Sequence, residues 1–229
     1  MVSNGAKRVM PQRARKDEDK EARRQLILDE ALALYTATSY AEVKMADVAE
    51  RAKLAKGTVF LYFPTKEALF LALLEEQLFA WFNRLEERLA QGEEQWTGPR
   101  LARSVAESLQ GEEPLTRLMA RLQTVLEQNV TSEQVRGFKQ RLLEAVVRSG
   151  TLVEKRLPFL APGQGVRFLL HVNALVVGLR QMADLAPVVR EVFEATPHLA
   201  PLRVDFTREL TDSLTTLLRG LESQERVQA

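Results

Sequence analysis

The chain has 229 residues, of which 45% are hydrophobic and 28% charged, with a formal net charge of +1 and no cysteine. This composition is ordinary for a globular protein, and the length suffices for one large or two modest domains with a hydrophobic core. The absence of cysteine excludes disulfides, a thiolate nucleophile and a cysteine-ligated metal site.

No segment predicts export or membrane insertion. The N-terminus is basic but lacks an apolar core, so it does not have the pattern of a secretory signal. The longest apolar run, LLHVNALVVGL, is about half as long as a membrane span. We therefore expect a soluble, cytoplasmic protein without membrane association.

The small net charge conceals an asymmetry along the chain. Residues 1–66 contain 13 Lys/Arg against 9 Asp/Glu, a balance of +4, whereas residues 67–229 have a balance of −3. A positive excess in one part of a chain is the charge that a nucleic-acid surface requires. The N-terminal part is therefore the candidate for such a surface.

The chain predicts an all-α fold, because no run alternates in the manner of a strand and proline and glycine fall mostly between segments of helical period. Residues 1–16 are basic and almost free of large apolar side chains, which predicts a disordered arm. Residues 17–38 form the first expected helix, with Ile27, Ala31, Leu34 and Tyr35 on its inner face.

The stretch Val43–Lys66 predicts two short helices joined by a tight turn. Apolar residues recur at helical spacing in Met45–Ala52, Lys53–Ala55 is long enough only for a turn, and Lys56–Phe63 supplies the second helix. Pro64 ends that helix, because proline has no N–H and disfavours helical geometry at the residue before it. This is the helix-turn-helix arrangement, whose second helix lies in the DNA major groove.

The pattern AxxxxxxVAERAxxxKGTVFxYFPTKEALF, from Ala41 to Phe70, resembles the DNA-binding domain of the TetR family of transcriptional repressors. The resemblance covers residues 24–74 and implies a homodimer that binds a palindromic double-stranded DNA operator. It implies that positions 56–58 and 61–62 read base edges and that Lys66 contacts a phosphate. The candidates for DNA binding are Lys44, Lys56, Gly57, Thr58, Phe60, Leu61, Tyr62 and Lys66.

Four positions depart from the family's pattern. Lys44 and Ala55 stand where the family has a capping Thr and a capping Ser, and neither residue can cap in that way. Lys53 replaces the glycine of the turn, although a left-handed turn costs more without glycine. Phe60 replaces an aromatic residue that offers a hydroxyl to phosphate. These changes leave the fold prediction intact and weaken the prediction of some phosphate contacts.

The chemistry of the second helix supports part of the implied base reading. Lys56 can donate to guanine and Thr58 can bond a base or a phosphate, whereas Leu61 can touch only thymine methyls or sugars. Tyr62 carries the remaining hydroxyl, and Gly57 allows the backbone to approach the DNA closely. For the arm at residues 1–16, a solvated tail and a contact with DNA phosphates or the minor groove both stay open.

A long helix from Thr65 to Ala90 is expected next, with Thr65 as its N-cap, and it links the DNA-binding head to a helical body. Helices follow at 99–110, at 114–129, and from a Thr131/Gln134 capping box to Leu157, with Gly150 as a weak point. A connector at 158–165 precedes a very apolar helix at 166–185, and a last helix carries the stripe Phe206, Leu210, Leu214, Leu217 and Leu221.

The apolar helix at 166–185 is hydrophobic nearly all round, so one of its sides needs a partner. The simplest arrangement pairs it and the last helix with the same helices of a second copy, which the family resemblance also implies. The expected interface residues are Leu175, Gly178, Leu179, Leu210, Leu214 and Leu217.

Catalysis has little support, because the chain has two histidines, no Glu-x-x-His pair and no glycine-rich phosphate loop. We expect no enzyme, no cofactor and no metal site. The candidates for contact with a small apolar effector are Phe79, Phe82, Met119, Gln123, His171 and Asn173. His171 can equally be a core or interface residue, and the two phenylalanines and Met119 can be core.

The expected domains are the arm at 1–16, the head at 17–66 and a ligand-binding and dimerisation body at 67–229. We interpret the chain as a ligand-responsive, DNA-binding transcriptional regulator, most simply a repressor. The alternative is a helical protein-interaction adaptor in which the helix-turn-helix is only structural, since Phe60 and Leu61 make that helix unusually apolar.

Overall fold

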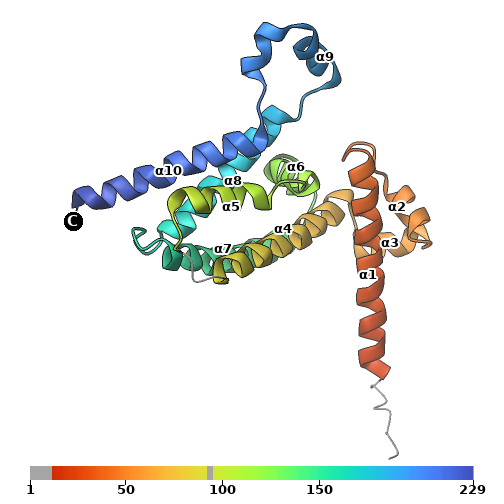
Figure 1. Cartoon of the computed structure of the whole chain (residues 1–229). Helices are drawn as coiled ribbons and strands as arrows, with labels where there is room; N and C mark the ends of the chain where they lie inside the picture. Colours follow the sequence, from red (N-terminus) through yellow and green to blue (C-terminus); the bar gives the residue numbers. More distant parts are fainter. Residues whose placement is uncertain (1–11, 92–94, 229) are drawn as a thin grey trace, which may run out of the picture. The chain divides into compact units, whose positions relative to one another are not determined.

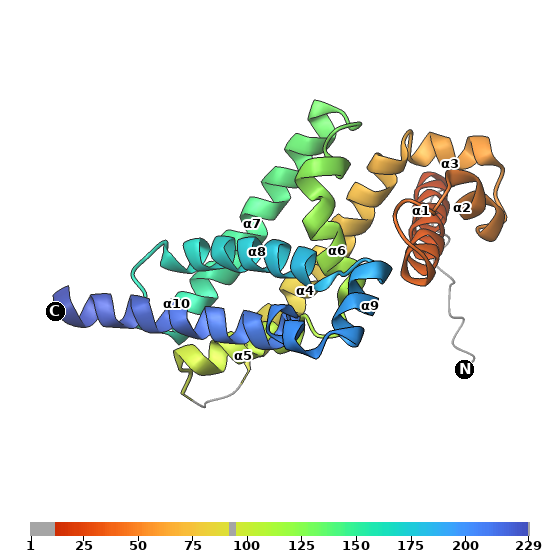
Figure 2. The same cartoon turned by 90° about the horizontal axis from the view of Figure 1, so that it is seen from above.

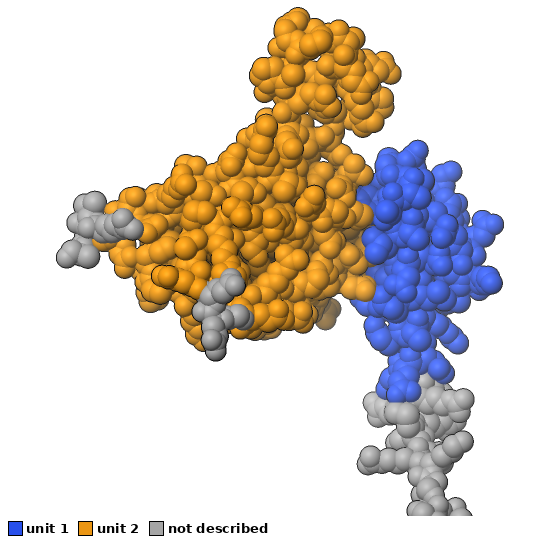
Figure 3. Space-filling model, viewed as in Figure 1, with its two compact units in different colours: residues 1–69 blue, residues 70–229 orange. Residues whose placement is uncertain are grey.

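The computed structural model describes residues 12–91 and 95–228, all of whose regular elements are helical. The chain divides into two compact units, residues 1–69 and residues 70–229, shown in blue and orange in Figure 3. This boundary lies three residues beyond the predicted one. The predicted all-α class is confirmed.

The first unit contains α1 (Gln12–Ala37), α2 (Met45–Arg51), α3 (Lys56–Tyr62) and the first residues of α4 (Lys66–Ala90) (Figure 1). The predicted helix boundaries agree with these within about two residues, except that α1 begins at Gln12. The expected disorder is therefore wrong for residues 12–16, while residues 1–11 lie outside the described part. The core of this unit consists of Ile27, Leu28, Ala31, Tyr35, Val48, Ala49, Val59 and Phe63, all buried.

The turn between α2 and α3 has the conformation that usually requires glycine. Lys53 has a φ of 54°, in the left-handed region. The N–H of Lys53 donates to the carbonyl of Glu50 (3.1 Å) and the N–H of Leu54 to that of Ala49 (2.9 Å), which is the Schellman pattern of a helix end. Neither Lys44 nor Ala55 caps its helix through a side chain. The turn therefore adopts a left-handed geometry without glycine, and α2 and α3 begin without side-chain caps.

The second unit contains most of α4 and the elements that follow it (Figures 1 and 2): α5 (Gly98–Ser108), α6 (Glu113–Arg121), a π-helical turn η1 (Leu122–Leu126), α7 (Ser132–Arg156), α8 (Gln164–Ala183), α9 (Pro187–Ala195), a 3-10 turn η2 (Pro197–Leu202) and α10 (Phe206–Gln228). α10 packs against α5 and runs antiparallel beside α8, and α8 also packs against α6 and α7. α8 is therefore the central helix of the body.

Two of these helix starts have the predicted capping residues, Thr65 and the Thr131/Gln134 pair, and a third has a cap that was not predicted, Thr97. Thr65 accepts a hydrogen bond from the N–H of Ala68 (3.0 Å), and Thr97 accepts one from the N–H of Arg100 (3.4 Å). The capping box of Thr131 and Gln134 is complete, as predicted. These caps fix the entry of the chain into three of the body's helices.

Gly150 is not a weak point of its helix, as the sequence suggested, but part of a close helix crossing. A Cβ built on Gly165 of α8 would lie only 2.1 Å from the carbonyl oxygen of Gly150 in α7. A Cβ on Gly150 would lie 2.7 Å from the backbone nitrogen of Val166. Both positions require glycine because the two backbones touch there, so this crossing sets the spacing of α7 and α8.

The segment of α9 and η2 was not predicted. It forms a lobe that projects from the rest of the second unit (Figures 1 and 3), and neither element buries a residue. Over the described ranges, no single helix is long and apolar enough to cross a membrane, although two bent pairs (α3 with α4, and α8 with α9) meet the length and hydropathy criteria together.

Candidate nucleic-acid interface and ligand cavity

The recognition helix α3 separates its core-facing and solvent-facing residues clearly. Val59 is fully buried, and Phe63, directly after the helix, is also part of the core. Leu61 is 85% exposed, Lys56 and Gly57 are exposed, and Thr58 and Tyr62 are half-buried. The residues expected to face the groove therefore lie outside the head's core, on the surface that a major groove would receive.

Two of the expected DNA contacts, Lys56 and Lys44, are lysines at the surface of the head. The ammonium of Lys56 lies over the ring of Phe60, 5.7 Å from its centre, and the Phe60 side chain is 36% exposed. Lys44 is exposed at the start of α2, where it makes no capping hydrogen bond. Both ammonium groups stay at the surface and can approach phosphates or bases.

Lys66 makes intramolecular contacts that the sequence did not predict. Its ammonium donates to the carbonyl oxygen of Tyr40, lies 3.4 Å from that of Ala41, and sits 4.3 Å from the centre of the Tyr40 ring. Both of these carbonyl acceptors are neutral groups. Lys66 therefore joins the start of α4 to the turn after α1, and it is half-buried there.

The body contains a mainly apolar cavity of about 320 Å³ formed by α4, α6, η1, α7 and α8. Four of the six expected ligand contacts line it: Phe82, Met119, Gln123 and Asn173. The other lining residues are Leu78, Trp81, Leu122, Lys139, Leu142, Leu143, Val146, Val166, Leu169, Leu170 and Val172. Its volume is at the lower end of the range for small-molecule sites. Only Gln123, Lys139 and Asn173 provide strong polar groups.

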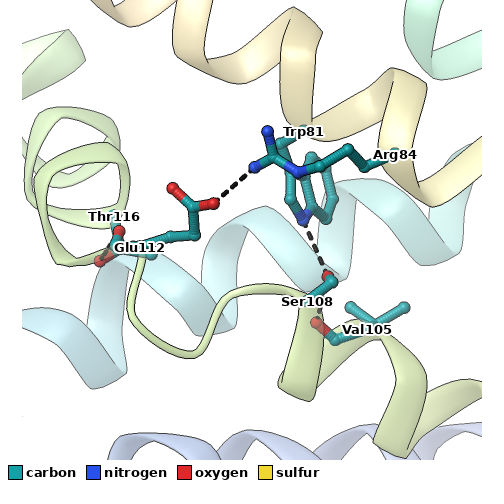
Figure 4. Close-up of polar contacts among 6 residues, drawn as sticks. All are labelled: Trp81, Arg84, Val105, Ser108, Glu112 and Thr116. Atoms are coloured by element: carbon teal, nitrogen blue, oxygen red, sulfur yellow. Dashed lines mark hydrogen bonds and ion pairs between the residues drawn. The ribbon is translucent and has the colours of Figure 1, made fainter.

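Trp81 is the main cavity residue that the sequence interpretation missed. Its indole N–H donates to the hydroxyl of Ser108 (2.9 Å), which in turn donates to the carbonyl of Val105 (2.7 Å), as Figure 4 shows. Because this buried pair fixes the ring, the apolar body of the indole lines the cavity while its polar edge is satisfied elsewhere. Trp81 follows Leu78 by three residues on the apolar face of α4. This spacing would have indicated that both side chains face the same side of the helix.

Ion pairs and hydrogen bonds anchor α4 on both sides of the cavity. Arg84 bonds Glu112 (2.6 Å), just before α6, as Figure 4 also shows. On α7, Arg148 and Ser149 both donate to Glu86 (2.9 Å and 2.6 Å), and the bond to Glu86 raises the pKa of Arg148. These contacts hold α4 against two other walls of the cavity.

His171 does not line this cavity, and neither does Phe79. His171 borders a different groove, of about 640 Å³, formed by α8 and α10 with Ala174, Leu175, Asp212, Ser213, Thr216 and Leu217. Within the described part of the chain its buried Nδ1 has no hydrogen-bond partner. The expected ligand contact of His171 is therefore wrong for this cavity, and the interface alternative remains.

The expected interface needs a correction on α10. Leu210 and Leu214 are fully buried inside one copy of the chain, because they are on the face of α10 that is turned into the body. Leu217, Leu175 and Leu179 are partly exposed and Gly178 is exposed. A partner on this side would therefore meet the groove beside Leu175 and Leu217, not the buried stripe.

The described residues contain no group of three or more His, Asp or Glu side chains placed to hold a metal ion. The candidate sites are thus the exposed face of the short helix α3 in the first unit, and an apolar cavity and an exposed groove in the second.

Comparisons with known proteins cover both units. Residues 27–73 match the family described as bacterial regulatory proteins, tetR family, and residues 75–225 match the family described as tetracyclin repressor-like, C-terminal domain. The HTH-type transcriptional repressor KstR of Rhodococcus jostii (strain RHA1) is 42% identical over 66 residues, 29% of this chain and 29% of KstR. The matched part spans less than a third of the length of the curated relatives.

Solved structures extend the likeness over most of the chain. A tetR-family transcriptional regulator from Streptomyces coelicolor has a TM-score of 0.55 at 17% identity, covering 91% of this chain and 84% of the other. The fatty acid degradation regulator FadR from Bacillus halodurans has a TM-score of 0.54 at 15% identity, covering 86% and 94%. At these identities the likeness shows the fold.

Proposed function

Since the chain belongs to the tetR family of bacterial regulatory proteins, we propose that it is a homodimeric repressor of transcription that a small apolar molecule releases from a palindromic operator. Each copy would place α3 in the major groove of one half-site. Two copies related by a two-fold axis would read the two halves of the palindrome.

The division of α3 into a buried and an exposed face carries this proposal. Lys56, Gly57 and Thr58 begin the helix on the solvent side, and Val59 is fixed in the core. In helix-turn-helix proteins the N-terminal residues of the recognition helix contact base edges. This geometry makes Lys56 and Thr58 the side chains best placed for base reading, and Lys66 a backbone contact.

The chemistry of the body cavity supports an apolar effector. Its walls are aliphatic and aromatic, and the polar groups of Gln123, Lys139 and Asn173 are few enough to orient a ligand without enclosing a strongly hydrated one. α4 contributes Leu78, Trp81 and Phe82 to the cavity, and the same helix begins in the DNA-binding unit. Occupation of the cavity can therefore bias α4, and through it the spacing of the two heads.

This release requires that the ligand bind the two head spacings with different affinities. The half-sites of such a dimer lie about 34–36 Å apart, so a change of a few ångströms in head separation would prevent both heads from docking together. The groove of α8 and α10, which Leu175 and Leu217 help to line, is the surface that we assign to the second copy.

The alternative of a protein-interaction adaptor has one supporting observation, the exposure of Leu61 and Phe60 on α3. Binding of the purified protein to random-sequence duplex DNA over a series of salt concentrations separates the two. A DNA-binding protein loses affinity linearly in a plot of log K against log salt, whereas the adaptor has no affinity to lose. Selection from a random duplex library should then enrich an inverted repeat.

A further inference from the structure

A second pocket in the body has a chemistry opposite to that of the apolar cavity. It measures about 280 Å³ and is lined by Arg117, Ala120, Arg121, Thr124, Arg180, Gln181 and Asp184. Three of these side chains are cationic and one is anionic. Arg117 already engages that carboxylate, donating to Asp184 from Nε (3.1 Å) and Nη2 (2.7 Å). The side chains that line the pocket therefore include more cationic than anionic groups.

Arg180 is the unusual member of this set. It is only 8% exposed, and its Nε has no hydrogen-bond partner among the described residues. The ring of Phe206 covers its guanidinium at 4.2 Å, which orients the group without satisfying its N–H donors. A buried cationic group with an unused donor is costly, so a site of this kind is favoured by an anion that accepts from it.

The electrostatic surroundings of Arg180 agree with this geometry. Burial lowers its pKa below the ordinary value and Arg117 acts in the same direction, whereas Glu113 and Asp184 oppose the change. The guanidinium nevertheless stays protonated, because arginine does not lose its proton in proteins. The group therefore keeps its full charge in a site where water solvates it poorly.

We propose that the pocket around Arg180 binds an anionic group, a carboxylate or a phosphate, with Arg121 as a second charged contact. Thr124 and Gln181 supply neutral hydrogen-bond donors in the same lining. A planar guanidinium with several N–H donors suits the oxygens of either anion. The proposal does not depend on DNA binding.

The anionic group can come from a free anion or from the head of an amphiphile. Asn173 of the apolar cavity and Arg180 are seven residues apart on one face of α8, which is a distance of about 10 Å along the helix. On the neighbouring α6 and η1, Met119 and Gln123 line the apolar cavity while Ala120 and Thr124 line the charged pocket. One molecule with an apolar chain and an anionic end could therefore occupy both.

The test is calorimetric titration of the full chain with decanoate, decanol and inorganic phosphate, in a buffer free of other carboxylates and oxyanions. The variants are Arg180→Gln and Arg121→Gln. Arg103→Gln is the matched control, because Arg103 is exposed on α5 and outside the pocket. Unfolding curves establish that each variant is folded, and Arg121→Gln serves alone if the buried substitution prevents folding.

An amphiphile source predicts that decanoate binds more tightly than decanol, and that Arg180→Gln or Arg121→Gln reduces this preference about tenfold while Arg103→Gln keeps it. If the ligand is a free anion, the wild type should bind phosphate, the same variants should bind it more weakly, and decanoate and decanol should bind with equal affinity. The proposal is overturned if the wild type binds neither phosphate nor decanoate in preference to decanol, or if the pocket variants bind as the wild type does.

Discussion

The head and the body of this protein place their functional residues in opposite ways. In the head, the exposed face of one seven-residue helix, α3, carries the candidate contacts, and a small core behind it only fixes their direction. In the body, the cavity is enclosed by five elements, and its lining residues come from positions between Leu78 and Asn173. The first site is local in the chain and the second depends on how distant helices pack.

This difference predicts how each site responds to substitution. A change on the outer face of α3 should alter binding without altering folding, because those side chains contribute nothing to the core. A change at the body's sites should affect stability and binding together, unless it falls on the exposed groove or the pocket rims.

The pair Leu214→Asp and Leu217→Asp separates the buried and exposed faces of α10. Leu214 is fully buried, so an aspartate there should cost about 3–5 kcal/mol of folding free energy, because its charge has no partner in the core. Leu217 borders the exposed groove, so its aspartate should leave the fold intact and yield monomers that bind DNA weakly. Chemical unfolding and sedimentation measure the two effects. A folded dimer in the Leu217 variant would contradict the assigned interface.

On the head, Lys56→Ala and Lys66→Ala should weaken DNA binding in different ways. Loss of a base contact at Lys56 should cost about 1–3 kcal/mol against the selected operator and much less against random duplex. Lys66→Ala should weaken both about equally and reduce the salt slope by about one. Anisotropy titrations with the two duplexes give the ratio of operator affinity to random-duplex affinity for each variant. Equal loss of specific and random binding in both variants would remove Lys56 as a base reader.

Ser108→Ala should destabilise the body and loosen the cavity wall. The indole N–H of Trp81 would lose its buried acceptor, which costs about 1–3 kcal/mol, and the ring would be free to move. Ser104→Ala, one turn earlier on α5, is the control, since that side chain has no hydrogen bond in the described structure. Thermal unfolding and the emission spectrum of Trp81, in a Trp96→Phe background, report the two effects. Equal behaviour of both serine variants would show that the indole is held by packing alone.

The smallest expected effect is a gain of stability from Lys53→Gly. The left-handed φ of Lys53 destabilises the folded state by about 1–2 kcal/mol, and glycine would not have this strain. The greater freedom of glycine in the unfolded chain would cancel about 0.4–1 kcal/mol of that gain. We expect a net stabilisation of about 0.5–1 kcal/mol. Lys53→Ala keeps a Cβ and should give no gain. If alanine stabilises the head as much as glycine does, the charge of Lys53, and not its backbone, is responsible.

The sequence allowed helix boundaries to be predicted in both the head and the body, for a physical reason. Short-range signals such as Pro64, the Thr65 cap and the Thr131/Gln134 box determine where helices begin and end, and all three predictions were confirmed. The left-handed conformation of Lys53 agrees with the family resemblance, in which a glycine makes this turn.

The predictions for the body were wrong where the periodicity of a helix allows two interpretations. The leucine stripe of α10 marks an apolar face, but it does not say whether that face meets the same copy or a second one, and so Leu210 and Leu214 were misassigned. His171 and Asn173 are two residues apart on α8 and face different cavities, which only the packing of α8 decides. Gly150 looked like a defect because the partner that requires it, Gly165, is on another helix.

The central claim is that a ligand in the body and the operator at the head oppose each other. The most direct test titrates the tightest binder from a series of straight-chain alcohols and carboxylates into the full chain, with and without saturating operator duplex. The account predicts weaker ligand binding in the presence of operator, and a loss of operator affinity by the same factor when the ligand saturates, because the coupling is reciprocal. Equal ligand affinities with and without operator would contradict it.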